Sequence, residues 1–160
     1  MKIFIALAFT LLLLGCQGEI IELFPGKLIP VAPFEVRVDL DQKAEKILRE
    51  RKETIHISGN FAGVPDKNSC LKENNKATGF VFGSFEKELD ISDKTLTVRF
   101  DKLQVPERII NRLENKHYGI ELSVRTGWKS SQFNLLSCDP PLISEGSRQY
   151  LYKCKINSLF

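Results

Sequence analysis

Apolar and polar residues alternate along much of the chain, which is the pattern of β-strands that bury one face. In residues 34–40, Phe34, Val36, Val38 and Leu40 alternate with charged residues. Six further segments alternate or carry short apolar runs: residues 54–61, 80–85, 96–100, 120–124, 133–138 and 149–156. The pattern predicts seven strands in which antiparallel pairs dominate.

Two short stretches have the spacing of amphipathic helices. Asp41 can cap the first, residues 42–51, in which Ala44, Ile47 and Leu48 share a face. Pro106 suits the first turn of the second helix. The apolar stripe of that second helix consists of Ile109, Ile110 and Leu113. The sequence therefore predicts a mainly β domain, an antiparallel β-sandwich with two short helices.

A weak internal repeat refines this prediction. Residues 36–39 read Val-Arg-Val-Asp and residues 98–101 read Val-Arg-Phe-Asp, an offset of 62. Each is followed by a short helix and an alternating strand, and these strands contain Ile57-Ser58 and Leu122-Ser123, an offset of 65. A pseudo-two-fold pair of strand–helix–strand units would explain the repeat. Chance similarity between short segments is the alternative.

The first 15 residues have the pattern of a secretory signal peptide. Lys2 supplies a positive start, and residues 3–14 form a 12-residue apolar run interrupted only by Thr10. The run is shorter than the roughly 18 residues that a membrane-spanning helix needs. The segment that follows, Leu13-Leu14-Gly15-Cys16, resembles the lipobox of bacterial lipoproteins. An ordinary signal peptide with an incidental cysteine is the alternative.

The lipobox resemblance implies a lipid anchor. In that family the cysteine is diacylated on sulfur, the chain is cleaved before it, and its new amine is acylated. Cys16 would then be the first residue of the mature protein, held to the membrane by its acyl chains. Gln17 follows, where the resemblance associates Asp with inner-membrane retention. The expected location is therefore the outer membrane, facing the periplasm, with the inner membrane and the cell surface left open.

These patterns divide the chain into three parts. Residues 1–15 are the predicted signal peptide, 16–33 a lipidated cysteine with a Pro- and Gly-containing tether, and 34–160 the β domain. The tether is apolar enough that part of it should pack on the domain or form a first edge strand. Lys and Arg number 23 against 20 Asp and Glu, a formal charge of +3, which does not favour nucleic-acid binding.

Three cysteines remain after the predicted anchor: Cys70, Cys138 and Cys154. An exported protein meets an oxidising compartment, where thiols tend to pair. Three thiols allow one disulfide in three ways. Cys138–Cys154 is the favoured pair because these residues flank a turn-rich stretch between expected neighbouring strands. Closing that loop would contribute about 3 kcal/mol in the chain-entropy model. Cys70 is then expected to be a free thiol in a polar loop.

The motifs of common enzymes are absent from the sequence. His56 and His117 have no metal-ligand spacing around them, and no nucleophile elbow or phosphate-binding loop is present. Glu86 and Glu88 fall on one face of a strand, for which a solvated surface is the favoured interpretation. We therefore expect no metal, no cofactor and no enzymatic activity. Trp128 lies in an expected loop, where it either contacts a partner or, as favoured, folds back over the core.

A second resemblance concerns the domain itself. Residues 53–61, Glu-Thr-Ile-His-Ile-Ser-Gly-Asn-Phe, are followed by Gly63 and Pro65, and residues 134–138 read Asn-Leu-Leu-Ser-Cys. Together with Cys154 as a late partner, these stretches resemble uncharacterised Gram-negative envelope lipoproteins. The resemblance implies an exported, disulfide-bearing β domain and carries no known activity.

Three functions are compatible with these features. The favoured one is a non-enzymatic envelope protein that binds another periplasmic protein or supports an assembly, through an exposed aromatic patch around Trp128. The alternative is an inhibitor or immunity lipoprotein that blocks a wall-active enzyme or toxin with a protruding loop, Ala62–Thr78. A periplasmic enzyme would require His56 or His117 to converge with Cys70 or a carboxylate in a pocket.

Overall fold

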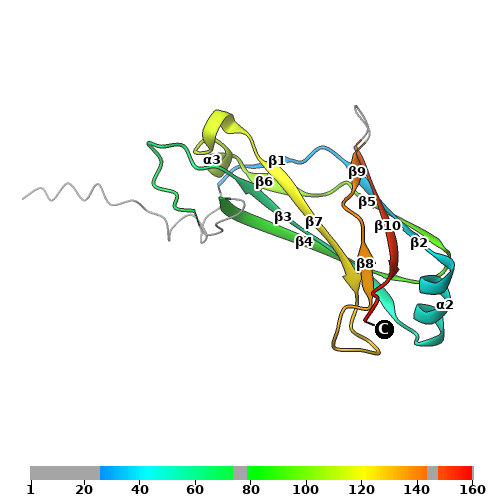
Figure 1. The fold of residues 1–160 in the computed structure, drawn as a ribbon. Helices are drawn as coiled ribbons and strands as arrows, with labels where there is room; N and C mark the ends of the chain where they lie inside the picture. Colours follow the sequence, from blue (N-terminus) through cyan, green and yellow to red (C-terminus); the bar gives the residue numbers. More distant parts are fainter. Residues whose placement is uncertain (1–25, 74–78, 144–147, 160) are drawn as a thin grey trace, which may run out of the picture.

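The computed structural model describes residues 26–73, 79–143 and 148–159, and the strands in these ranges form three sheets (Figure 1). The predicted signal peptide, Cys16 and the first part of the predicted tether lie outside them. The strands are β1 (Leu28–Pro30), β2 (Phe34–Leu40), β3 (Thr54–Gly63), β4 (Phe80–Asp90), β5 (Thr95–Phe100), β6 (Gln104–Pro106), β7 (Gly119–Thr126), β8 (Leu136–Cys138), β9 (Leu142–Ile143) and β10 (Gln149–Ile156). The helical segments are α2 (Gln42–Glu50), α3 (Glu107–Ile110) and the 3₁₀ turn η1 (Glu114–Lys116).

The predicted mainly β, sandwich-like fold with short helices is confirmed. One sheet has the order β5-β2-β10-β8, with β9 paired to β10, and a second has the order β4-β3-β7. One pair departs from the expected antiparallel pattern, because β10 runs parallel to β2. Two neighbouring parallel strands require a long connection between them. The connection from β2 to β10 is long, because β10 is the last strand and returns to lie beside β2. Strands β1, β6 and β9 are too short to leave a periodic signal.

The core lies between the two larger sheets. Alternate residues of β2 and β3 are fully buried: Val36, Val38, Ile55 and Ile57. Phe85 of β4 reaches across the core, with its ring centroid 5.8 Å from that of Phe34 and 4.9 Å from that of Phe100. Both contacts are edge-to-face, the geometry that aromatic pairs favour. These aromatic contacts join the β4-β3-β7 sheet to the sheet that contains β2 and β5.

Corresponding strands of the two repeat units lie side by side. In the antiparallel pair β2–β5, Val36 lies opposite Val98, and in the pair β3–β7, Ser58 lies opposite Ser123. The repeat makes Val98 the equivalent of Val36 and Ser123 the equivalent of Ser58. Antiparallel pairing of equivalent residues is what a pseudo-two-fold repeat requires of each pair. The helices of the two units differ in length, with nine residues in α2 and four in α3.

The helical segments form where the pattern predicts them. The Asp41 side chain accepts the N–H of Ala44 at 2.6 Å, so it caps α2 as expected. The second helix is shorter than its apolar stripe suggests, because regular helix ends at Ile110 and η1 follows. Figure 1 shows α2 at one end of the sandwich and α3 with β1 and β6 at the other.

Part of the predicted tether belongs to the fold. Residues 28–30 pair with residues 104–106 as the strands β1 and β6, and the buried Val31 donates its N–H to the carbonyl of Leu103 at 2.9 Å. This agrees with the expectation that the tether packs in part on the domain. In the ranges that the structure describes, no helix has the length and apolar character to span a membrane.

The cysteines confirm one prediction and correct another. Cys138 on β8 lies opposite Cys154 on β10, and the two form a disulfide across a sequence separation of 16 residues. The expectation that Cys70 is a free thiol is wrong, because Cys70 is disulfide-bonded. The neighbouring Leu71 is buried, so this segment packs on the domain and does not form the purely polar loop that the sequence suggested.

Candidate functional site

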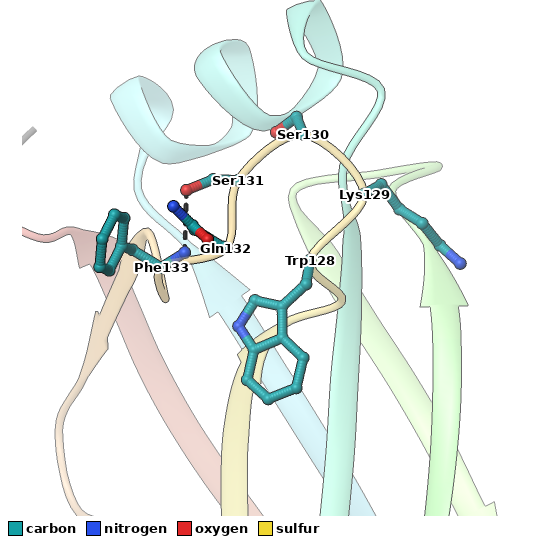
Figure 2. Close-up of a pocket in the computed structure, with 6 residues that line it drawn as sticks. All are labelled: Trp128, Lys129, Ser130, Ser131, Gln132 and Phe133. Atoms are coloured by element: carbon teal, nitrogen blue, oxygen red, sulfur yellow. Dashed lines mark hydrogen bonds between the residues drawn. The ribbon is translucent and has the colours of Figure 1, made fainter.

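The candidate site combines the loop between β7 and β8 with the outer face of the β4-β3-β7 sheet. We call residues 127–133 the Trp128 loop; they begin directly after β7 and, apart from Gly127, line a shallow hollow (Figure 2). Figure 1 places this loop at the same end of the domain as α2 and the described C-terminal residues. On the adjoining outer face of the sheet the side chains are polar, whereas the side chains of the inner face are mainly apolar and point into the core.

A buried carboxylate holds the Trp128 loop in place. Glu53 directly precedes β3 and is only 3% exposed. It accepts the backbone N–H groups of Lys129 and Ser130, each at 2.8 Å, and the Ser130 hydroxyl at 2.7 Å. Burial raises the pKa of the Glu53 carboxyl, but these hydrogen bonds and one from the Thr54 N–H outweigh burial and lower it below its ordinary value. Glu53 is therefore an ionised anchor for the loop.

Gly127 lets the loop start close to β3. Its N–H donates to the Thr54 carbonyl at 2.9 Å, which continues the β3–β7 pairing by one residue. A Cβ atom at position 127 would collide with the Thr54 hydroxyl and lie 2.6 Å from a carboxylate oxygen of Glu88. Glycine is therefore required here by the close approach of these side chains.

Trp128 is half-exposed and is held in a left-handed backbone conformation. Its φ is +59°, which is unusual for a residue other than glycine, and its exposed fraction is 50%. The favoured expectation that this side chain covers the core is therefore wrong. The guanidinium of Arg125 lies 4.0 Å from the indole ring centre, a cation–π contact on the outer face. The left-handed turn, together with the Glu53 hydrogen bonds that follow it, directs the ring to this face.

A row of side chains crosses the three strands beside Trp128. Arg125 of β7 donates from Nε to Nδ1 of His56 at 3.2 Å, and Nε2 of His56 lies 3.1 Å from a carboxylate oxygen of Glu86 on β4. Since arginine carries only donors, Nδ1 is the acceptor and the imidazole proton resides on Nε2, which donates to Glu86. His56 points away from the buried Ile55 and Ile57, as the alternation predicted.

A second set of contacts joins the Trp128 loop to β4. The Thr54 hydroxyl donates to Oε1 of Glu88 at 2.5 Å, and Nζ of Lys129 lies 3.0 Å from the same oxygen. The hydrogen bond from Thr54, followed by that from Lys129, lowers the pKa of the Glu88 carboxyl. Figure 2 shows Lys129 extending to the side of the loop away from Phe133. Lys129 therefore reaches across β3 to the edge strand.

The end of the loop is also anchored. Oδ1 of Asn134 accepts the N–H of the fully buried Thr126 at 3.0 Å, and its amide group donates to the Leu136 carbonyl at 3.0 Å. These contacts delay the start of β8 to Leu136, three residues after the predicted strand start at Phe133. Phe133 is 60% exposed and, like Trp128, lines the hollow.

The other candidate residues lie elsewhere. His117, between η1 and β7, lines a second hollow beside Gly63, whereas His56 is near the opposite end of β3. The proposed inhibitory loop, Ala62–Thr78, begins inside β3 and is tied down where the Asp66 N–H donates to the Arg112 carbonyl at 2.8 Å. Residues 74–78 of it lie outside the described ranges. Within the described part of the chain, no three His, Cys, Asp or Glu side chains form a group that could hold a metal ion.

The structure joins residues that the sequence could not connect. The sequence places Glu86 and Glu88 together on one strand face but does not connect them with Trp128 or His56, and here all four meet on one surface. The residues that link them were not predicted: Glu53, Thr54, Arg125 and Lys129. Strand alternation assigns Thr54 and His56 to one face, but only the strand register brings Arg125 and the glutamates to them. No protein-family model matches the chain, and no curated protein or solved structure is significantly similar to it.

Proposed function

We propose that the protein is a lipid-anchored cell-envelope protein whose β domain binds another envelope protein through the Trp128 loop. The anchor is supported by the lipobox-like segment that ends at Cys16, and the outer-membrane location by Gln17. The binding role is supported by the way in which the domain presents Trp128. Under this proposal the protein has no enzymatic activity of its own.

The observation that carries the proposal is the fixed, strained and half-exposed conformation of Trp128. A left-handed φ costs a non-glycine residue about 1 kcal/mol or more, and this cost persists only where surrounding contacts enforce the conformation. Here the buried Glu53 and the close packing at Gly127 enforce it. A tryptophan that is already ordered loses little conformational entropy on binding, and tryptophan is enriched among residues that dominate binding energies.

The row through His56 favours binding over catalysis. Its Nδ1 accepts from Arg125 and its Nε2 donates to Glu86, so both ring nitrogens are engaged. A general base needs a nitrogen that is within reach of a substrate proton and able to accept it. The row also lies on a sheet face, whereas the hollow described beside it is lined by residues 128–133. The same side chains suit the polar rim of a protein interface.

The test is an in-cell crosslink and pull-down of the protein with its anchor, followed by mass spectrometry. We expect one stoichiometric envelope partner, which is lost in Trp128→Gly and kept in Val64→Ala. Val64 is a matched control because it is equally exposed, at 51%, but lies directly after the far end of β3. Recovery of no partner above background, or a partner unaffected by Trp128→Gly, contradicts the proposal. The partner's identity separates support of an assembly from inhibition of a wall-active enzyme or toxin.

A further inference from the structure

The two edges of the β4-β3-β7 sheet differ in whether neighbouring segments cover them. On the β7 edge, the Thr126 N–H is taken by Asn134 and the Leu122 carbonyl accepts the Tyr152 hydroxyl at 3.1 Å. That edge is therefore covered by neighbouring segments. The opposite edge is β4, whose strand partner within the described ranges is β3. Figure 1 shows β4 along the outer border of this sheet.

The register identifies which backbone groups of β4 point outward. Because the Gly127 N–H donates to the Thr54 carbonyl, Thr54 and every second residue after it direct their backbone groups to β7. The intervening residues, including Ile55 and Ile57, therefore pair with β4. Ile57 lies opposite Lys87, so Lys87 points inward to β3.

The backbone groups of Ser84, Glu86 and Glu88 consequently point away from β3. Within the described ranges, none of these N–H or carbonyl groups has a backbone partner. All three residues are exposed, and the strand is regular between them. An unpaired edge of this kind is a template for another extended chain.

We propose that residues 84–88 of β4 are a strand-addition site for an extended peptide segment that carries Lys or Arg at alternate positions. This inference rests on the proposed protein-binding function and specifies how the partner is held. The backbone of the added segment would pair with the outward N–H and carbonyl groups of Ser84, Glu86 and Glu88. Its cationic side chains would lie beside the carboxylates of Glu86 and Glu88 on the outer face.

The charges on β4 explain why the occupant is a basic segment. The Glu86 side chain is 75% exposed and the Glu88 side chain 41% exposed, so both carboxylates are accessible to a neighbouring strand. Two copies of β4 paired antiparallel about residue 86, 87 or 88 would place glutamates of the two copies opposite each other. Like charges in that position are destabilising, so the edge disfavours self-association and favours alternating cations.

The Trp128 loop adjoins the proposed strand site. Lys129 of the loop contacts Glu88 at 3.0 Å, and the row from Arg125 through His56 ends at Glu86. A partner strand on β4 would therefore lie next to the surface that carries Trp128. One partner could engage the aromatic loop and the strand edge together.

The test uses the purified full-length protein and a synthetic peptide, acetyl-Thr-Lys-Val-Lys-Val-Lys-Thr-amide. Amide hydrogen exchange is followed residue by residue with NMR. In the protein alone, the N–H groups of Ser84, Glu86 and Glu88 should exchange faster than those of Phe85 and Lys87. Saturating peptide should slow the three outward N–H groups by about tenfold or more and leave the inward ones unchanged.

Matched controls separate strand addition from general charge attraction. Two versions of the peptide carry N-methyl groups on alternate backbone amides, one on the odd-numbered amides and the other on the even-numbered amides. If the backbones pair, only one of these two versions should bind. A version with Glu in place of Lys should not bind. Ser84→Pro removes one outward N–H and should weaken binding about fivefold to tenfold, whereas Ser84→Ala keeps that N–H and should bind as the wild type does. Hydrogen exchange at Lys87 verifies that each variant retains the β3–β4 pair.

Three results would each overturn the inference: no protection of the outward N–H groups, equal binding of the two N-methylated peptides, or equal binding of the acidic peptide. None of them decides the broader proposal, because the crosslinking test depends on Trp128 and not on this edge. A partner that is captured through Trp128 without protection of β4 would reject strand addition alone.

Discussion

The Ser130 hydroxyl donates to the buried carboxylate of Glu53 at 2.7 Å, although the two residues are 77 positions apart in the chain. The same carboxylate accepts two backbone N–H groups of the Trp128 loop. One side chain at the start of β3 therefore fixes the loop that follows β7. The conformation of Trp128, and the surface it forms with Arg125, depend on this contact.

Glu53→Gln should loosen the loop and destabilise the domain by about 2 kcal/mol, because an amide cannot match an anion that accepts several buried hydrogen bonds. The folded-state pKa of Glu53 is lowered, so its contribution is present above the unfolded value of 4.5 and is lost as the pH falls through the lower folded pKa. Urea unfolding at a series of pH values tests this. The acid loss of stability should be smaller in Glu53→Gln, whereas the exposed control Glu50→Gln should match the wild type.

Trp128→Gly should be more stable than Trp128→Ala by about 1 kcal/mol. Both variants lose the ring and its contact with Arg125, but only glycine relieves the left-handed strain at φ +59°. Chemical unfolding of the pair measures the difference. Equal stability would mean that the backbone at position 128 is not strained, and the argument for an enforced tryptophan would fail.

Gly127→Ala should destabilise the protein by about 2 to 3 kcal/mol, because the added methyl group meets Thr54 and Glu88. Gly119→Ala, at the first residue of β7, is the matched control, since a Cβ there has no neighbour within 4 Å. Thermal unfolding of both variants tests the close approach. A similar loss in the two variants would instead indicate a general cost of replacing glycine in or next to β7.

Cys16→Ser should prevent acylation and move the protein from the membrane fraction to the soluble fraction, or leave it unprocessed. Gln17→Asp should redirect its sorting between the membranes if the host follows the usual rule. Cell fractionation with acyl labelling measures both effects. Membrane retention that is unchanged in Cys16→Ser would refute the predicted anchor.

A non-reducing peptide map should join Cys138 to Cys154, the pair that lies across β8 and β10. Removing this disulfide by Cys138→Ala with Cys154→Ala should cost about 3 kcal/mol. The same map tests the anchor, because acylation uses the sulfur of Cys16 and excludes a disulfide there. A Cys16 peptide that carries no acyl group would contradict the lipoprotein proposal.

Local pattern was sufficient to predict most of the strands and the cap of α2. Side chains that alternate along β2, such as Val36 and Val38, are fully buried as a two-residue period requires. The proline-containing segment before β2 was expected to pack in part on the domain, and its residues form β1. The Cys138–Cys154 pair also followed from expected neighbouring strands, although it had two competitors.

The candidate site depended on information that no local pattern contains. Alternation assigned His56 to the outer face, but its contacts with Arg125 and Glu86 arise from the register of three strands. The exposure of Trp128 is decided by Glu53, which lies far away in the sequence.

The sequence by itself thus determined most of the secondary structure, the mainly β class and the buried faces of the longer strands, because these follow from the period of apolar residues within each segment. It also supplied the whole argument for the lipid anchor at Cys16. Only the tertiary structure decided the parallel pairing of β10 with β2, the position of residues 84–88 of β4 at the border of their sheet and the surface around Trp128. These features depend on which distant segments become neighbours, and that is settled by the packing of the entire core.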